Sequence, residues 1–281
     1  MKIIVLVISS ALSFLMFNLS LMAQTMDIIS YNIRYNNPND GDDQWEERKQ
    51  DVVHFFTTYQ PTAFGVQEAT HEQMEYLKNE LTGYSEIGVG RDDGETKGEY
   101  SAIFYQKDAL EVITEGTFWL SPTPEKVSKG WDAALPRIYT YAQFKHKETD
   151  KTFWHFNTHF DHRGAKAREE SAKVILKEIE ALTHDNEPLV VTGDFNATPD
   201  APPIQIMSED LTDPSALKGI ILDGTIGTFS GFELQAPLKN RIDYIFVRGL
   251  KVEKYAHMND KRPNGRWISD HLPVKITVLF E

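Results

Sequence analysis

Short apolar runs that end in polar residues recur along the chain. They are rich in β-branched and aromatic side chains, and several are apolar enough for both faces to be covered by other parts of the protein. These features are typical of strands in a folded core. The predicted strands are residues 27–31, 63–67, 100–105, 152–157, 188–192, 242–247 and 274–280.

Segments with helical periodicity lie between these runs, at residues 46–58, 71–81 and 165–183. In the third, Ala172, Ile175, Ile179 and Leu182 recur at three- and four-residue spacing, which predicts one apolar helix face. Strands and helices are interleaved and no linker divides the chain after residue 24, so we predict a single α/β domain over residues 24–281. Two long polar connections, residues 36–44 and 121–137, are candidates for functional loops.

The first residues have a different pattern. Lys2 is followed by 15 apolar or small residues, and Leu21, Met22 and Ala23 then form a plausible cleavage site. This predicts a secretory signal peptide at residues 1–23 and export to a periplasm or to the exterior. An uncleaved membrane anchor is the alternative, but five Ser and Asn residues between positions 9 and 20 make the run less apolar than a typical spanning helix.

Composition narrows the choice of function. Lys and Arg total 29 against 42 Asp and Glu, a net charge of -13, so the chain lacks the broad basic surface that non-specific duplex binding uses. There are no cysteines, which excludes disulfides and a lipid-modified cysteine, so the exported domain must be stabilised by its core alone. Asn196 begins a glycosylation sequon and is also a candidate site residue. A secretory route that glycosylates proteins would put this residue at risk, so a bacterial host is the simpler interpretation.

Residues that bind metals or move protons lie at the ends of several predicted strands. Carboxylate and amide oxygens suit hard cations such as Mg²⁺ or Mn²⁺, with Ca²⁺ as an alternative, and the absence of Cys makes zinc a poorer fit. Each residue alone also has an ordinary structural explanation as a turn or strand cap. The residues are Asn32, Glu68, His159, Asp194, Asn196, Asp243, Asp270 and His271.

Six segments, in order, resemble the motifs of the endonuclease/exonuclease/phosphatase superfamily, which includes pancreatic deoxyribonuclease. The resemblance covers the chain from about residue 26 to its end. It implies a deoxyribonuclease-like four-layer α/β sandwich, with two packed mixed sheets flanked by helices and a metal site at one end. The segments are residues 30–34 (SYNIR), 67–68 (QE), 157–159 (NTH), 193–196 (GDFN), 241–243 (RID) and 269–274 (SDHLPV).

The resemblance also implies roles for the individual residues. Glu68 is expected to be the main ligand of the divalent ion, with Asn32 and Asp270 as further oxygen ligands or as holders of bound water. The pair Asp243–His271 and the second histidine, His159, are expected to be catalytic. Asp194 is expected to orient or deprotonate the attacking water, and Asn196 to hold the phosphate in the transition state. Sequence leaves open whether Asp194 or His271 is the base.

Five further residues are candidates for contact with substrate. Arg34 stands where apurinic endonucleases carry an acidic residue, an arrangement that resembles pancreatic deoxyribonuclease, and a salt bridge is its alternative role. Tyr105 is placed like an active-site tyrosine, or is a core aromatic residue. Trp131, Arg137 and Arg163 are either substrate contacts or parts of packed or solvated loops.

The leading hypothesis is an exported, divalent-metal-dependent phosphoesterase, a monomer with no obligate protein partner, that cleaves a phosphodiester or phosphomonoester by in-line attack of water. The substrate class stays open among small molecules, lipid head groups and nucleic acids, and a nuclease acting on DNA or RNA is one alternative. A non-catalytic binding module with the same fold is a second alternative.

Overall fold

The computed structural model describes residues 25–184 and 187–280 of the chain. The predicted signal peptide, residues 1–23, lies outside the described residues. Within the described part of the chain, no helix combines the length and the apolar character needed to cross a membrane.

The larger sheet has seven strands in the order β3-β4-β2-β1-β12-β11-β9. β1 runs parallel to β2 and antiparallel to β12, so the sheet is mixed. Its strands are β1 (Thr25–Asn32), β2 (Ala63–Ala69), β3 (Tyr84–Ile87), β4 (Tyr100–Gln106), β9 (Leu222–Gly224), β11 (Leu250–His257) and β12 (Val274–Phe280).

The second sheet has five strands in the order β10-β8-β7-β6-β5. β7 and β8 are parallel, whereas β10 is antiparallel to β8. Its strands are β5 (Leu110–Trp119), β6 (Ile138–His146), β7 (Thr152–His159), β8 (Leu189–Asp194) and β10 (Asp243–Arg248).

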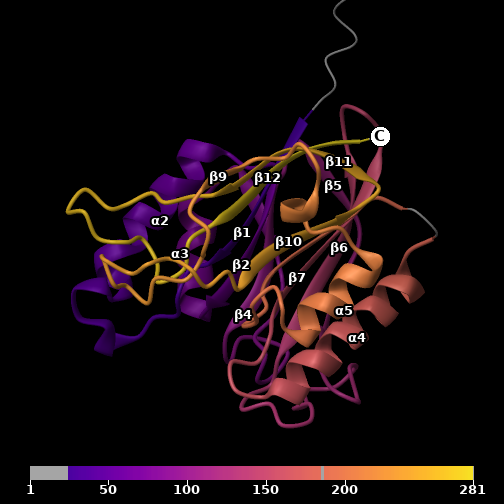
Figure 1. Cartoon of the computed structure of the whole chain (residues 1–281), viewed down its shortest axis with the longest axis horizontal. Helices are drawn as coiled ribbons and strands as arrows, with labels where there is room; N and C mark the ends of the chain where they lie inside the picture. Colours follow the sequence, from indigo (N-terminus) through magenta and orange to yellow (C-terminus); the bar gives the residue numbers. More distant parts are fainter. Residues whose placement is uncertain (1–24, 185–186, 281) are drawn as a thin grey trace, which may run out of the picture.

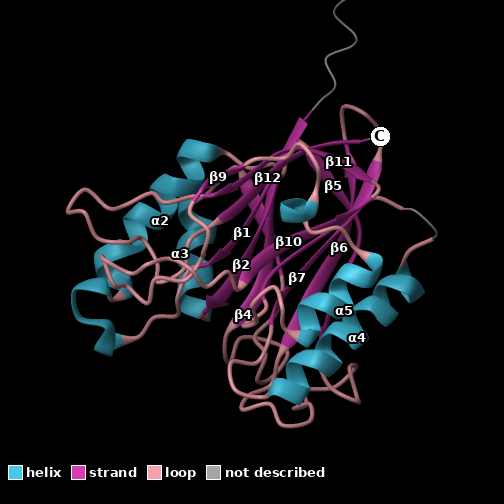
Figure 2. Ribbon diagram, in the orientation of Figure 1, coloured by secondary structure: helices cyan, strands magenta, loops and turns pink. Residues whose placement is uncertain are grey.

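Helices cover the outer face of each sheet, which makes four layers (Figures 1 and 2). α2 (Trp45–Tyr59) and α3 (His71–Glu80) pack on the seven-stranded sheet, where Phe55, Phe56 and Leu77 belong to one buried cluster. α4 (Ala165–Leu182) and α5 (Pro202–Asp210) pack on the other sheet. The predicted four-layer α/β sandwich is confirmed.

The space between the two sheets is mainly apolar but contains a buried polar network. Gln67 Nε2 donates to Asn157 Oδ1 (2.6 Å), and Thr192 Oγ1 donates to the same oxygen (2.9 Å). A Cβ atom on Gly65 would collide with the Asn157 and Thr192 side chains, so glycine lets the sheets approach each other here. Gln67 directly precedes Glu68 in β2, and Thr192 lies two residues before Asp194 in β8. The network therefore joins the two sheets close to the strand ends that carry these carboxylates.

All seven predicted strands and three predicted helices occur in the structure, with ends that differ by a few residues. Sequence analysis did not identify β3, β5, β6, β9, β11 or α5. The connection at residues 121–137 contains no helix or strand, as predicted. The other, at residues 36–44, is not an irregular loop throughout, because it contains the 3₁₀ helix η1 (Pro38–Asp43). A second 3₁₀ helix, η2 (Pro214–Ala216), lies between α5 and β9.

Candidate active site

The directions of five strands bring most of the predicted site residues to one end of the sandwich. β1 and β2 are parallel, so Asn32 and Glu68 lie at the same edge, and β7 and β8 are parallel, with His159 opposite Asp194. β10 runs the other way and therefore begins at this edge, with Asp243 opposite Asp194. These pairings explain why catalytic candidates far apart in the sequence become neighbours.

Three residues at this end adopt a left-handed backbone that is uncommon for side chains other than glycine. The φ angles are 58° at Arg34, 66° at Glu68 and 47° at Asn196. Glu68 also lies at a bulge, where the pairing of β2 with β4 shifts between Gln67 and Ala69. Unfavourable backbone conformations often cluster at functional sites, because the surrounding structure holds side chains there in chosen directions.

His271 is held between two buried carboxylates. Its Nδ1 lies 2.9 Å from Oδ2 of Asp243, and its Nε2 lies 3.7 Å from Oδ2 of Asp194. Burial alone would disfavour the imidazolium, but the negative charges of Asp243 and Asp194 outweigh burial and raise the pKa of His271 well above its ordinary value. His271 is therefore a cation at neutral pH, which presents an N–H group from Nε2.

His159 is in the opposite electrostatic situation. Its Nδ1 lies 3.0 Å from the Arg137 guanidinium, which can only donate, so Nδ1 accepts and Nε2 carries the proton. Burial and the positive charges of Arg137 and Arg91 lower the pKa of His159 well below its ordinary value. Nε2 lies 3.4 Å from Asp194 and 3.1 Å from the side-chain amide of Asn196. The site thus pairs a neutral histidine with a cationic one.

Asp194 is the residue that these groups share. Its carboxylate accepts hydrogen bonds from the Asn32 amide (2.9 Å) and from the backbone N–H of Asn196 (2.9 Å). Burial raises the pKa of Asp194 above the usual aspartate range, although the cationic His271 opposes this. A raised pKa makes the carboxylate a stronger base, which suits a group that takes a proton from water.

A divalent cation fits the donors found at this end. Ligand atoms of Glu68, Asp194 and His271 all lie within 4.8 Å of one another. Burial and the negative charge of Glu68 raise the pKa of Asp270, despite opposing cations. A bound cation would relieve this crowding of acidic groups, and their oxygens suit Mg²⁺ or Mn²⁺. The cluster differs from the predicted ligand set in containing Asp194, whereas His271, as a cation, has no nitrogen lone pair with which to bind the ion.

The structure places the other two predicted ligands beside this cluster. The Asn32 amide nitrogen donates to Glu68 (3.1 Å), while its Oδ1 accepts from the backbone N–H of Arg34 (3.0 Å). Asp270 lies next to His271 and 3.8 Å from the Arg34 guanidinium. In this arrangement Asn32 orients the carboxylates, and direct binding of an ion by Asn32 or Asp270 stays a prediction.

Two predicted substrate contacts reach the site, but each is engaged by protein groups. The Arg34 guanidinium makes two hydrogen bonds to Asp40 (2.9 and 3.0 Å) and lies 3.9 Å from Glu68. Arg137 is buried behind His159, where it also contacts Asp161 (3.3 Å). Their geometry favours holding other site groups in place, and contact with substrate stays untested.

Within the described part of the chain, three other predicted contacts make no side-chain hydrogen bond or ion pair with the catalytic cluster, by which we mean Glu68, His159, Asp194, Asn196, Asp243 and His271. Trp131 precedes Asp132, whose carboxylate accepts from backbone N–H groups at the start of α4. Arg163 is exposed just before the same helix. Tyr105 lies at the opposite end of β4, beside Ala63, and packs against Phe144 between the sheets (5.0 Å between ring centroids). A core role, the alternative considered above, accounts for Tyr105.

Sequence analysis missed three residues that complete the site. Glu99 lies 3.8 Å from His159 and makes a two-point ion pair with Arg91 (2.6 and 2.9 Å). Phe229 packs edge-on against His271, with ring centroids 4.9 Å apart. The long, glycine-containing connections that carry these residues, 88–99 and 225–240, are the signal that would have pointed to them.

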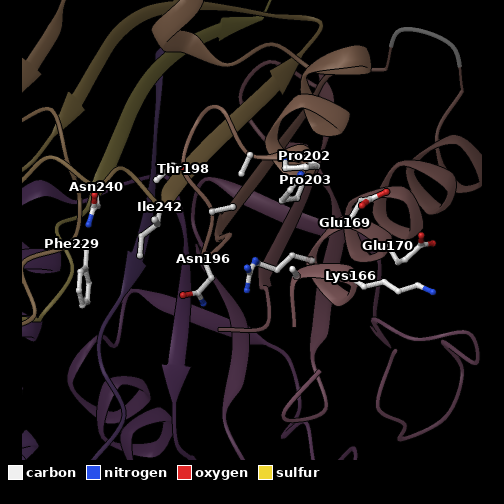
Figure 3. Close-up of a pocket in the computed structure, with 14 residues that line it drawn as sticks. Lys166, Glu169, Glu170, Asn196, Thr198, Pro202, Pro203, Phe229, Asn240 and Ile242 are labelled. Carbon is white, nitrogen blue, oxygen red and sulfur yellow. The ribbon is translucent and has the colours of Figure 1, made fainter. Parts of the chain in front are cut away.

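Two cavities open beside the catalytic cluster. The larger, about 680 Å³, lies between the start of α4, the segment after β8 and the segment before β10, and its lining includes Asn196 and Phe229 (Figure 3). The smaller, about 530 Å³, is lined by Tyr35, Arg91 and Glu99, among others. The end of the sandwich that carries the candidate catalytic residues therefore has a cavity on two sides.

Solved structures of similar proteins cover nearly the whole chain. A mannosyl-6-phosphatase from Bacteroides thetaiotaomicron is 38% identical, with a TM-score of 0.86, and the match covers 91% of this chain and 100% of that one. An endonuclease/exonuclease/phosphatase protein from Bacteroides vulgatus is 37% identical, with a TM-score of 0.87, and the match covers 92% and 100% of the two chains. Both are similar in fold and in sequence.

Curated relatives are more distant. An uncharacterised protein, L388, of Acanthamoeba polyphaga mimivirus is 28% identical over 160 residues, which cover 54% of this chain and 59% of that protein. The chain spans somewhat under six tenths of the length of the curated relatives it matches. The sequence profile of the endonuclease/exonuclease/phosphatase family matches residues 29–271, a range that contains every residue of the catalytic cluster. The chain belongs to the endonuclease/exonuclease/phosphatase family.

Proposed function

We propose that this chain is a divalent-metal-dependent phosphoester hydrolase that acts on phosphomonoesters of sugars. The observation that carries the proposal is the pair of histidines around Asp194: neutral His159 and cationic His271 both face one buried carboxylate. Members of the family hydrolyse phosphoester bonds. The preference for a sugar monoester is supported by the identity of 38% with a mannosyl-6-phosphatase.

The protein groups have complementary tasks in this reaction. The N–H groups of His159 and His271 can donate to the non-bridging oxygens of the phosphate, and they are held in place before substrate binds, which favours transition-state stabilisation. The His271 cation also offsets the charge that develops on those oxygens. A metal ion held by Glu68 with Asp194 or Asp270 would supply further charge neutralisation at the phosphate.

Asp194 is the better candidate for the base. His271 is already protonated at neutral pH, because its pKa is raised, so it has no lone pair with which to accept another proton. Asp194 can take a proton from water as the water oxygen bonds to phosphorus. The phosphorus–oxygen bond to the alcohol then breaks, and the alcohol oxygen takes up a proton from solvent. This choice between the two residues is part of the proposal.

The proposal is tested by comparing hydrolysis rates of a sugar phosphomonoester and a phosphodiester. The purified protein is assayed with Mg²⁺ or Mn²⁺, and the Asp194→Asn, His271→Ala double variant supplies the background. We expect metal-dependent release of phosphate from the monoester at a rate well above that of the diester. A clear preference for a nucleic acid diester would support a nuclease instead. Turnover of neither substrate would leave a binding module.

We also propose that the enzyme is exported. The support is the apolar run of residues 3–17 with Ala23 at the candidate cleavage site. N-terminal mass analysis of the protein recovered outside the cytoplasm is expected to give a chain beginning at Gln24. Recovery of the chain in the cytoplasm with Met1 intact would contradict export.

A further inference from the structure

The larger cavity has a direct connection to the catalytic residues. Asn196, whose side chain contacts His159, is part of its lining, and so is Phe229, whose ring packs on His271. Figure 3 shows Phe229, Asn240 and Ile242 on one side of the cavity, Asn196 beside them, and residues of α4 on the other side. Its volume of about 680 Å³ lies within the range typical of small-molecule sites.

Phe229 is held in place by the backbone around it. Its strand-like bridge to His271 is flanked by hydrogen bonds from Ser230 and Leu272 N–H groups to the carbonyls of Asp270 and Thr228 (2.8 and 2.6 Å). The Phe229 side chain nevertheless remains 37% exposed. A fixed aromatic surface that stays accessible beside catalytic groups is suited to packing against a ring of the substrate.

The aromatic residue in the smaller cavity is less available. The Arg34 guanidinium lies 4.5 Å from the centre of the Tyr35 ring, so one face of that ring is already occupied. The Glu99 carboxylate, which lines the same cavity, is engaged by Arg91. The larger cavity therefore offers the better surface for a substrate ring.

The charges around the larger cavity favour a ring with hydroxyl groups over a nucleic acid strand. Two cations and two carboxylates line the cavity, so their formal charges cancel, whereas a polyanion is bound by an excess of cations. Glu169 and Glu170 are both engaged by Lys173 (2.8 and 3.1 Å), and the Asn240 amide adds a neutral donor and acceptor. The charged lining residues are Lys166, Arg168, Glu169 and Glu170.

The position of Asp194 also bears on which cavity receives the alcohol part of the substrate. Asp194 is only 1% exposed, so a water molecule that it activates attacks phosphorus from the floor of the site. In-line attack makes the alcohol leave on the side of the phosphorus opposite the attacking water. Asn196, whose backbone N–H donates to Asp194, also lines the larger cavity, so this cavity is the one that we assign to the alcohol part of a phosphomonoester.

We propose that the larger cavity is the specificity site of the enzyme, in which Phe229 packs against the ring of a sugar phosphate and Asn240 hydrogen-bonds its hydroxyl groups. This inference rests on the proposed phosphomonoesterase function and adds to it the residues that select the sugar. Phe229 and Asn240 select substrate, and the chemistry stays with the catalytic cluster.

The test compares two monoesters, mannose 6-phosphate and ethyl phosphate, which lacks the ring. Phe229→Ala is expected to lower kcat/KM for mannose 6-phosphate by about tenfold, and Asn240→Ala by about fivefold, mainly through KM. In each variant kcat/KM for ethyl phosphate is expected to fall by less than that for mannose 6-phosphate, so the ratio of the two values falls. The matched aromatic control is Tyr35→Ala in the smaller cavity, which is expected to leave the ratio of the two values unchanged.

Three results would overturn the specificity site. Equal losses on both monoesters would mean that Phe229 acts only through His271. The ratio of kcat/KM for mannose 6-phosphate to that for ethyl phosphate could fall in Tyr35→Ala and stay unchanged in Phe229→Ala and Asn240→Ala. That result would place the sugar in the smaller cavity. If Phe229→Ala and Asn240→Ala slow the hydrolysis of an oligonucleotide but not that of mannose 6-phosphate, the larger cavity binds a nucleotide.

A binding measurement separates this inference from the proposed function. The non-hydrolysable phosphonate analogue of mannose 6-phosphate is titrated into the wild-type protein and the variants in the presence of Mg²⁺. We expect the Kd to rise by about tenfold in Phe229→Ala. An unchanged Kd contradicts the specificity site even if the enzyme is active. If wild type hydrolyses neither monoester, the proposed function fails, while the Kd values still decide where the sugar phosphate binds.

Discussion

Asp194→Asn is expected to lower kcat for phosphoester hydrolysis by about a thousandfold, the order associated with loss of a general base. Asn has nearly the same shape, so it keeps an oxygen for the N–H of Asn196, but it cannot accept a proton from water. The substitution also removes one of the three carboxylates that raise the pKa of His271, the others being Asp243 and Asp270. Single-turnover rates at saturating substrate and Mg²⁺ measure the chemical step directly.

The same variant has a clear control for folding. Burial raises the pKa of Asp194, which means that the ionised carboxylate is held in an unfavourable environment. A neutral amide removes this cost, so we expect the thermal midpoint of metal-free Asp194→Asn to equal or exceed that of wild type. Asp108→Asn, an exposed change at the turn between β4 and β5, controls for removing a negative charge. Near-wild-type kcat in Asp194→Asn would exclude Asp194 as the base and direct attention to a solvent-derived hydroxide.

The predictable part of the site consists of residues that end or begin buried strands. Asp194 follows an apolar run, and so does His159, and a regular sheet leaves such residues at an edge whatever the details of packing. The order of the motifs then identified the family and, through it, the layers of the fold. The pairing of Asp243 with His271 comes from the family resemblance, and the two residues lie at the start of β10 and just before β12, both readable as strands from their apolar pattern.

Strand direction explains the misplaced tyrosine. The segment of residues 100–105 was recognised as a strand, but its sequence does not state which end reaches the site. β4 runs antiparallel to β2, so Tyr100 and Ser101 lie beside Glu68, whereas Tyr105 lies beside Ala63 at the far end. Pairing direction depends on the whole sheet and is not encoded by the alternation of residues within one strand.

The residues that sequence did not reveal belong to long connections. Arg91 and Glu99 come from one loop and Phe229 from another, and each reaches its histidine only after the sheets have packed. β5 was missed because it is an edge strand, in which exposed polar residues dilute the apolar pattern. Loops and edges carry little periodicity, yet they determine the tautomer of His159 and the walls of both cavities.

Glu68→Gln is expected to raise the Mg²⁺ concentration needed for half-maximal activity by about a hundredfold, because outer contacts of metal ligands alone change affinity by about 10- to 100-fold. Glu68 accepts from the Asn32 amide and from the backbone N–H of Tyr35 (both 3.1 Å). A glutamine must turn its NH₂ group toward one of these donors, and it also loses the charge that attracts the cation. Excess Mg²⁺ is therefore expected to restore part of the activity.

Thermal unfolding gives a readout of the metal site that does not depend on turnover. A ligand that binds only the native state stabilises it in proportion to the logarithm of its concentration, so Mg²⁺ is expected to raise the Tm of wild type. The increase should be much smaller in Glu68→Gln and should be retained in Asp108→Asn. An equal increase in Glu68→Gln would show that the ion is held elsewhere. Metal dependence itself would be contradicted by two results together: a wild-type Tm that does not respond to Mg²⁺, and activity in the presence of a chelator. The carboxylates of Glu68, Asp194 and Asp270 would then function with His271, and not a metal ion, as their main local positive charge.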